Sequence, residues 1–203
     1  YAEGRNDPSL RRQSHLSPYL HFGQVSPCAV ALTAEAFQRA HAPRFDADIA
    51  IFLEELVVRR EFAVNLVWYC QGYDLPDKVL PEWAMKGLLD HEGDQRTTTY
   101  TAAQMERGRT GDEYWNAAQL EMVVTGKMHN YLRMYWAKQV LLWTRTAGEA
   151  YAFVLAQNNK WGLDGRGANG FAGVAWAFGH ADRPFPERPI FGPVRSMTRG
   201  GLE

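Results

Sequence analysis

Cysteine is scarce in this chain of 203 residues, which contains only Cys28 and Cys70. Their spacing matches neither a metal-binding motif nor a redox motif, so we expect a reducing, intracellular compartment. Long apolar runs are also missing: no stretch approaches the length that spans a bilayer, and no signal peptide is visible. The formal net charge is −1, which excludes a protein that grips nucleic acid over its whole surface. Any nucleic-acid contact must therefore come from a local patch.

Aromatic residues, by contrast, are plentiful, with seven Trp and nine Tyr. This content suits stacking on flat ligands and equally suits a large helical core. Hydrophobic residues make up 46% of the chain and charged residues 22%, the balance of an ordinary soluble globular domain. The length suffices for one sizeable core. Because the periodicity is helical nearly throughout and hairpin-bounded strand alternation is absent, we predict one all-α domain over residues 1–203.

Capping residues and apolar periodicity mark the expected helices. Ser26 followed by Pro27 is an N-cap with proline at the first helical position. Asp112 caps another helix, and Gly126 separates it from the next one. The predicted helices are 27–39, 46 or 48 to 69, 81–90, 101–107, 112 to 126, the helix carrying Arg133 and Trp136, 147–158, and 169–178. Residues 179–203, rich in Gly, Pro and Arg, are predicted to form an irregular basic tail.

The most informative segment is residues 111–144, which place an Arg, a Met and two Trp on one predicted helix. Arg133 and Trp136 are three residues apart and share a helical face, and Trp143 returns to that face two turns later. The two indoles are then about 10.5 Å apart along the axis, and Trp115 lies on the preceding helix. Spacings of this order allow an electron to hop from ring to ring. The alternative is that the three indoles simply fill a helical core.

Six sequence blocks follow one another along almost the whole chain. They are YAEGRNDP (1–8), SHLSPYLHFG (14–23), FLEELVVRREF (52–62), residues 111–143, LDGRGANGFAGVAW (163–176) and FGPVRSM (191–197). In this order they resemble the FAD-binding domain of the DNA photolyases and cryptochromes, most closely the class II cyclobutane pyrimidine dimer photolyases. The resemblance implies a multi-helical FAD-binding domain. Since residue 1 falls inside a matching block, we expect the C-terminal catalytic domain of a longer protein, with the relatives' N-terminal α/β antenna domain absent from this chain.

The resemblance assigns the edge of the flavin ring to a charged pair. The Arg of the family's HNxLRM-type motif, here Arg133, pairs with the Asp that opens the DGR motif, here Asp164. The alternative is a structural ion pair between a helix and a loop. Asn158 matches an Asn that faces flavin N5 and controls its protonation. An Asn near a helix end is also a common C-cap, and Asn159 stands beside it.

Further residues are implied for the rest of the cofactor. Ser side chains and free backbone N–H groups in the turn before Pro18 suit a pyrophosphate, and Tyr1 and Arg60 match residues near the adenine half and the phosphates. The complete set implied for FAD is Tyr1, Gln13, Ser14, His15, Leu16, Ser17, Arg60, Arg133, Asn158, Asp164 and Arg166.

The resemblance also implies a site for a pyrimidine dimer flipped out of UV-damaged DNA. Glu55 matches a glutamate that hydrogen-bonds the dimer's carbonyls and stabilises its radical anion. Trp176 matches the Trp that stacks on the dimer, and Met134 matches a Met of the same pocket. The alternatives are a plain core Trp and, for Glu55, an i,i+4 ion pair with Arg59. Arg59 itself departs from several relatives, which have a dimer-flanking Trp at this position.

The tail contributes the remaining candidates for DNA contacts. Arg183 and Arg195 match DNA-contacting positions, and Phe185 stands where relatives have a Trp wedge that fills the gap left by a flipped dinucleotide. Arg5 and Asn6 are further candidates for contacts near the lesion. Acidic residues dilute the tail's charge, so an ordinary solvated loop is the alternative.

Two departures from the family pattern concern local detail. The chain has GRGANG at residues 165–170 where relatives usually have GRDPNG, which predicts a looser turn. Asn130 stands where close class II relatives usually have Gly, while more distant photolyases have Asn. Both are typical of a divergent member.

The resemblance implies light-driven DNA repair. Reduced, anionic FAD absorbs blue or near-UV light and passes an electron to the flipped-out dimer, whose ring splits before the electron returns. Trp136, Trp115 and Trp143, in that order outward from the flavin, would serve photoreduction of oxidised FAD. The alternatives are a cryptochrome-like photoreceptor that binds FAD and signals through a partner protein, and a helical interaction domain without cofactor. We expect a cytoplasmic monomer, nucleoid-associated in a prokaryote or nuclear in a eukaryote.

Overall fold

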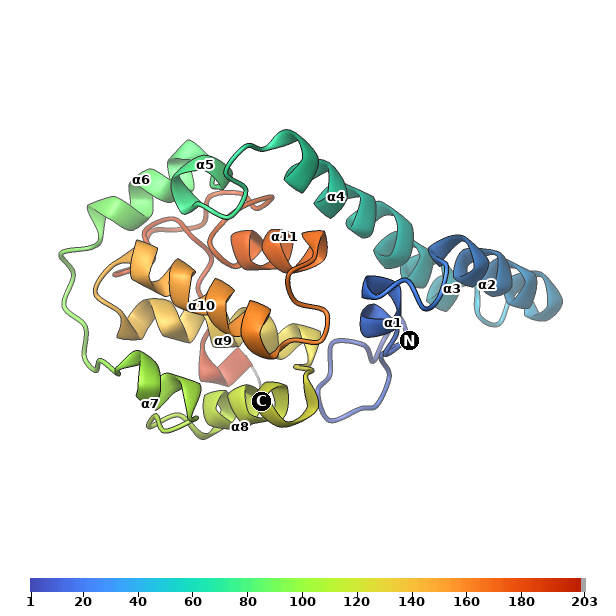
Figure 1. Cartoon of the computed structure of the whole chain (residues 1–203), viewed down its shortest axis with the longest axis horizontal. Helices are drawn as coiled ribbons and strands as arrows, with labels where there is room; N and C mark the ends of the chain where they lie inside the picture. Colours follow the sequence, from blue (N-terminus) through green and yellow to red (C-terminus); the bar gives the residue numbers. More distant parts are fainter. Residues whose placement is uncertain (202–203) are drawn as a thin grey trace.

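The computed structural model describes residues 1–201, and within them the chain is built from helices without any β-strand (Figure 1). The helices are α1 (Ser17–His21), α2 (Pro27–His41), α3 (Asp46–Leu53), the π-helical turn η1 (Glu54–Arg59), α4 (Arg60–Tyr69), α5 (Pro76–Val79), α6 (Glu82–Asp90), α7 (Ala102–Glu106), α8 (Glu113–Thr125), α9 (Asn130–Trp143), α10 (Ala147–Trp161), α11 (Ala168–Ala177) and the 3₁₀ turn η2 (Arg199–Gly201). The predicted all-α class is therefore confirmed. Residues 202–203 of the predicted tail lie outside the described residues.

Local capping chemistry explains where several helices begin and end. The Ser26 hydroxyl accepts a hydrogen bond from the Ala29 N–H at the start of α2, and the Asp112 carboxylate accepts one from the Trp115 N–H at the start of α8. Gly126 ends α8 with φ 71°, the left-handed conformation that favours glycine. The predicted caps at Ser26, Asp112 and Gly126 are thus confirmed.

The predicted long helix from residue 46 to 69 is present but interrupted. Its middle, η1, has π-helical hydrogen bonding between α3 and α4. A π turn inserts an extra residue into the helical repeat, so side chains beyond it are rotated relative to an ideal α-helix. This rotation changes which charged residues of η1 face one another.

Other differences from the prediction concern short helices and helix ends. Helices α1 and α5 span five and four residues, too few to produce a readable apolar period. Helix α10 extends to Trp161, three residues beyond its predicted end at residue 158. Helix α6 begins at Glu82, with Pro81 as its N-cap.

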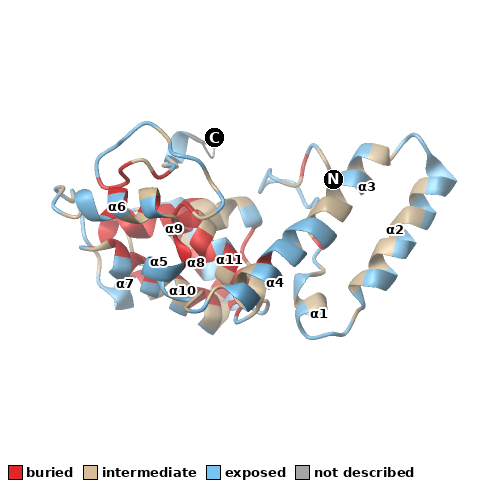
Figure 2. Cartoon of the chain, turned by 90° about the horizontal axis from the view of Figure 1, so that it is seen from above, coloured by how far each residue is buried: buried red, intermediate tan, exposed pale blue. Residues whose placement is uncertain are grey.

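The core lies in the body formed by α5 to α11, whereas α1, α2 and α3 contain no buried residue and extend away from it (Figures 1 and 2). Helix α9 is the most deeply buried, and eight of its 14 residues are buried. Helix α4 packs against α11 and so connects the projecting helices to the body. Within the described residues, no helix is both long and apolar enough to cross a membrane.

The tail after α11 is irregular, as predicted, but it is only partly solvated. Ile190, Phe191 and Val194 are buried in the core. The backbone N–H of Ile190 donates to the Asp94 carboxylate at 2.7 Å, and the N–H of Phe185 donates to the carbonyl of Pro193 at 2.8 Å. The Ile190 hydrogen bond and the buried side chains hold the tail against the body, and the Phe185 hydrogen bond joins two parts of the tail.

Candidate functional site

The three predicted tryptophans form one row of contacting rings between α8 and α9. The Trp115 ring lies between the other two, with its centroid 6.3 Å from that of Trp136 and 5.2 Å from that of Trp143. All three side chains are buried, and Trp115 is fully enclosed. The Trp115 indole N–H donates to the Trp136 carbonyl at 2.9 Å, and that of Trp136 donates to Gln119 Oε1 at 2.9 Å. These hydrogen bonds fix the ring planes.

Tyr100 extends this row and was not predicted. Its ring meets that of Trp143 edge-on, with centroids 5.1 Å apart, and its hydroxyl accepts a hydrogen bond from the Gly111 N–H at 2.8 Å. Tyr100 is partly exposed, so it connects the buried row to the surface. It lies in the irregular segment between α6 and α7, where no periodicity relates it to the tryptophans.

Arg133 is the centre of a polar cluster formed by α9, α10 and the loop that follows α10. Its Nη2 lies 3.0 and 3.3 Å from the two carboxylate oxygens of Asp164, and its Nη1 lies 3.4 Å from Asn158 Oδ1. Burial alone would raise the pKa of Asp164, but the charge of Arg133 and hydrogen bonds from Arg133 and Ser17 lower it below its ordinary value. The carboxylate is therefore ionised and orients the guanidinium.

Asn158 is not a C-cap, so that interpretation is wrong. It is 5% exposed and lies inside α10, which continues for three more residues. Two glycines pack against it, Gly165 in the following loop and Gly170 in the first turn of α11. A Cβ at Gly165 would lie 2.4 Å from the Asn158 carbonyl oxygen, and one at Gly170 would lie 2.9 Å from its side-chain nitrogen. The glycines of the GRGANG segment therefore let the loop close over Asn158.

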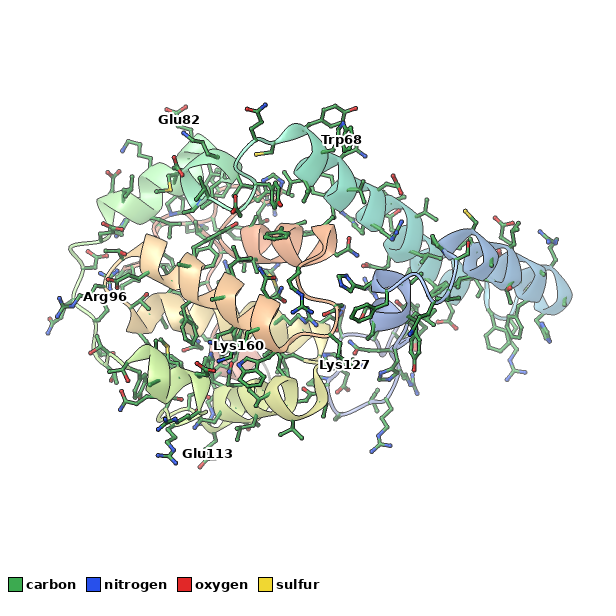
Figure 3. The ribbon with its side chains drawn as sticks, viewed as in Figure 1. Trp68, Glu82, Arg96, Glu113, Lys127 and Lys160 are labelled. Atoms are coloured by element: carbon green, nitrogen blue, oxygen red, sulfur yellow. The ribbon has the colours of Figure 1, made fainter. Side chains whose placement is uncertain are left out.

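The segment predicted to hold the cofactor's phosphates lies beside this cluster. Gln13 donates to Asn130 Oδ1 at 2.5 Å, at the first turn of α9. His15 has φ 56° and its ring hydrogen-bonds the ammonium of Lys127, which lies between α8 and α9 next to the N-terminal segment (Figure 3). His21 of α1 abuts Gly167 in the loop after α10. The structure therefore brings residues 13–17 to the side of Arg133.

The same place contains an orphaned polar atom and an excess of positive charge. His129 caps α9 with its Nδ1, while its Nε2 is buried and has no hydrogen-bond partner within residues 1–201. Burial and the charge of Lys127 lower the pKa of His129, and burial also lowers that of Lys127. Nearby cationic and imidazole groups with spare donor capacity suit an anionic group such as a phosphate. These residues fit the predicted cofactor.

The other residues implied for FAD make contacts of their own. The Tyr1 ring meets Phe52 edge-on, with centroids 5.8 Å apart. The Arg60 guanidinium lies 3.6 Å from the Glu61 carboxylate. Arg166 is exposed and donates to the carbonyl of Asn159 at 2.9 Å. No contact between described residues brings Arg60 or Arg166 directly to Arg133, so their roles rest on the resemblance.

The charged residues of η1 do not form the Glu55–Arg59 ion pair that the sequence offered as an alternative. Arg59 Nη2 lies 3.3 Å from Glu54, and Glu55 pairs instead with Arg5, whose Nη1 is 2.8 Å from Oε1. An i,i+4 pair between Glu55 and Arg59 is thus wrong, because the π turn makes residues i and i+5 neighbours. The Glu55 side chain is half-exposed, with 38% of its surface accessible.

Two of the predicted DNA-binding residues, Arg59 and Trp176, meet between η1 and α11. The Arg59 guanidinium lies over the Trp176 ring, 5.6 Å from its centroid, and Trp176 is only partly buried. Glu55 also lies on η1, ahead of Arg59, and pairs with Arg5. The Arg59 cation therefore covers a face of the indole that stays near solvent, and Trp176 is not a plain core residue. Met134 lies on α9, partly buried against the core.

In the tail, the structure brings Arg195 and Phe185 together. The Arg195 guanidinium lies over the Phe185 ring, 5.9 Å from the centroid. Arg183 is exposed, and its backbone N–H donates to the carboxylate of Asp182. Asn6 lies elsewhere, where its amide oxygen accepts a hydrogen bond from Asn130 at 3.4 Å.

Two surface hollows are lined by none of the predicted site residues. One, of about 410 Å³, is apolar and runs between α2 and α3. The other, of about 420 Å³, lies between α9 and the tail. The position proposed for the cofactor therefore rests on the polar cluster around Arg133 and its neighbours.

The fold and the site define a class of protein, an all-α domain that contains a row of contacting, buried indoles. No family model matches the chain. It is 49% identical over 199 residues to the deoxyribodipyrimidine photo-lyase of Methanothermobacter thermautotrophicus, and 45% identical over 205 residues to that of Arabidopsis thaliana. It is 41% identical over 204 residues to that of Potorous tridactylus.

These similarities extend over 98–100% of the chain, but the chain spans only 37–42% of the length of these relatives. The chain belongs to the deoxyribodipyrimidine photo-lyase family. The family predicted from the six sequence blocks is thereby confirmed, and the assignment to class II stays a prediction.

Proposed function

We propose that the protein repairs cyclobutane pyrimidine dimers in DNA by light-driven electron transfer from FAD, as a class II-like photolyase. The observation that carries this proposal is the identity of 41–49%, over essentially the whole chain, to proteins named deoxyribodipyrimidine photo-lyase. The arrangement of the candidate site agrees with it, since the residues implied for cofactor and DNA fall into two groups on α9 and its neighbours. The protein would act as a monomer where the cell keeps its DNA, in the nucleoid or the nucleus.

The cofactor group surrounds Arg133. Bound FAD would supply an electron donor that visible light can excite. Arg133, held by the ionised Asp164, presents positive charge and donors to an anionic ring, and Asn158 lies within reach of the same place. His129 and Lys127, beside residues 13–17, supply the positive charge and the donors that a pyrophosphate requires.

The DNA group comprises the residues of η1, α11 and the tail. Trp176 provides an aromatic face on which a flipped base stacks, and Arg59 lies over that ring. Glu55 is held by Arg5, and in its protonated form its carboxyl would donate a hydrogen bond to a carbonyl of a dimer, next to Met134 as the resemblance implies. In the tail, Arg195 supplies charge for a phosphate and Phe185 an apolar wedge. Arg183 and Asn6 complete the implied contacts.

The indole row would carry electrons between the cofactor and the surface. Trp136 follows Arg133 by one turn of α9, and Trp115 contacts both Trp136 and Trp143, so each transfer in the predicted order is between rings in contact. Tyr100, which is partly exposed, extends the row toward the surface. Such a relay would return oxidised FAD to its reduced state and would not take part in dimer cleavage.

Replacing Trp176 with alanine tests the lesion site directly. Loss of a base-stacking face is expected to weaken binding of a dimer-containing oligonucleotide in the dark by about 1–3 kcal/mol, or roughly 5- to 150-fold. Binding of the undamaged oligonucleotide should change little, because its bases stay stacked in the duplex. Fluorescence anisotropy with both oligonucleotides measures the difference.

Trp68→Ala is the matched control, because Trp68 is 79% exposed on α4 and points away from α11 (Figure 3). It should bind both oligonucleotides like the unmodified protein. Equal loss of affinity for damaged and undamaged DNA in the Trp176 variant would contradict a role in reading the flipped dimer.

A further inference from the structure

Gln119 on α8 is a fully buried amide whose role the proposed function leaves open. Its side chain makes three hydrogen bonds, each to a different helix. Oε1 accepts from the Trp136 indole N–H at 2.9 Å, and Nε2 donates to Gln157 Oε1 at 3.0 Å and to the Glu106 carbonyl at 3.2 Å. Helices α7, α9 and α10 therefore all meet at this one amide.

These partners allow the Gln119 amide one orientation. The backbone carbonyl of Glu106 can only accept a hydrogen bond, so it must face the nitrogen of the amide. The indole N–H of Trp136 can only donate, so it must face the oxygen. An amide turned the other way round would leave buried polar groups unpaired, which is costly. The oxygen of Gln119 is thus fixed against the indole nitrogen of Trp136.

The hydrogen-bond acceptors of the two inner indoles are chemically alike. Trp136 donates to the side-chain amide of Gln119, and Trp115 donates to a backbone amide, the carbonyl of Trp136. Both indoles are buried. An amide oxygen accepts hydrogen bonds but is far too weak a base to take up a proton, unlike a carboxylate or an imidazole. Within residues 1–201, neither of these N–H groups therefore donates to a base.

We propose that Gln119 is a positioning residue for photoreduction of FAD, because its oxygen holds the Trp136 N–H without removing the proton. The inference rests on the proposed function, in which Trp136 gives one electron to the photoexcited, oxidised flavin. Loss of that electron leaves an indole cation with a much more acidic N–H, which the negative end of the amide dipole stabilises. Since the proton stays in place, one electron from Trp115 restores Trp136, and the positive charge moves outward along the row.

A carboxylate in the place of this amide would change the outcome. It would take the proton of the oxidised indole, so that Trp136 would become a neutral radical and its recovery would require both an electron and that proton. The cation and the neutral radical absorb at different visible wavelengths, so they can be told apart. Gln119→Glu introduces a carboxyl of almost the same shape. Because burial raises the pKa of such a group, the variant is measured at pH 9.

The test is transient absorption of the FAD-loaded protein after a light pulse, with Trp115→Phe in every sample so that the positive charge stays on Trp136. With Gln119 in place the transient should be the cation, which disappears when the electron returns. With Gln119→Glu a neutral radical that lives many times longer should appear. With Gln119→Met, which removes the acceptor, the yield of the Trp136 cation should fall several-fold.

Gln139→Glu is the matched control, because Gln139 is a buried glutamine on α9 whose amide donates to the carbonyl of Met197. It should give the cation alone. In the flavin-free proteins, magnetic resonance of the isotope-labelled indoles checks the hydrogen bond itself, and thermal melts check folding. The Trp136 N–H should exchange with solvent faster in Gln119→Met.

The same cation, in the same yield and with the same lifetime, in both Gln119 variants would overturn this inference alone. Absence of photoreduction in the unmodified, FAD-loaded protein would contradict the proposed relay and this inference with it.

Discussion

Replacing Arg133 with leucine is expected to destabilise the protein by about 2–4 kcal/mol and to remove its ability to retain FAD. Its guanidinium bonds both carboxylate oxygens of Asp164, the Asn158 side chain and the carbonyl of Met128. Leucine would leave a largely buried carboxylate without its counter-ion and would remove the positive charge proposed for the flavin edge. Chemical denaturation measures the first effect, and flavin absorbance after gel filtration measures the second.

The pH dependence of stability separates this effect from simple loss of packing. In the unmodified protein the pKa of Asp164 is lowered, so its contribution to stability is present above the ordinary value of 3.8 and is lost as the pH falls through the lower, folded value. Without Arg133, burial instead raises the pKa of Asp164. Acidification then protonates this carboxylate and removes the destabilising buried charge from the variant. The stability gap between the two proteins should therefore narrow as the pH falls from 7 toward 4.

Arg109→Leu is the control for this experiment, since Arg109 is an exposed arginine in the turn before α8. It should retain both stability and flavin. Arg133→Lys should restore part of the stability but little of the flavin retention, because an ammonium cannot reproduce the fork-shaped pairing of a guanidinium. An Arg133→Leu protein that binds FAD as tightly as the unmodified one would contradict the proposed cofactor position.

Replacing Trp115 with phenylalanine is expected to abolish photoreduction of oxidised FAD while dimer repair by chemically reduced enzyme persists. Trp115 is the ring that contacts both Trp136 and Trp143, and phenylalanine is much harder to oxidise. The smaller ring also loses the hydrogen bond to the Trp136 carbonyl, at a cost of about 1–3 kcal/mol in stability. Absorbance under blue light with an external reductant follows the photoreduction.

Trp83→Phe provides the control, because Trp83 packs against the same core and, among the described residues, makes no ring contact with the row. It should lose some stability and keep photoreduction. Photoreduction by Trp115→Phe at the rate of the unmodified protein would show that the indole row is only a packing cluster, the alternative that the sequence left open.

Those parts of the fold that depend on neighbouring residues could be predicted from the sequence. The N-caps at Ser26 and Asp112 and the left-handed stop at Gly126 are local, so the sequence places these helix ends correctly. The short helices α1 and α5 could not be predicted, because neither is long enough to show a period. Burial of part of the tail depends on Asp94, which lies about a hundred residues earlier in the chain.

In the candidate site too, some contacts could be predicted from the sequence and others depend on how distant segments pack. The pairing of Arg133 with Asp164 was expected, and the structure shows it. The pairing of Glu55 with Arg5 was not expected, because a π turn changes the helical repeat and the residue pattern does not indicate a π turn. The sequence thus predicted the pairing of Arg133 with Asp164, and tertiary packing decided the partners of the other charged groups.

The most direct measurement of the proposed function is light-dependent repair of a thymine-dimer oligonucleotide by the purified protein, loaded with FAD and reduced under anaerobic conditions. The proposal predicts that intact thymines reappear under blue or near-UV light and that an identical sample in the dark shows none. Persistence of the dimer in the light, with flavin bound and photoreducible, would contradict repair.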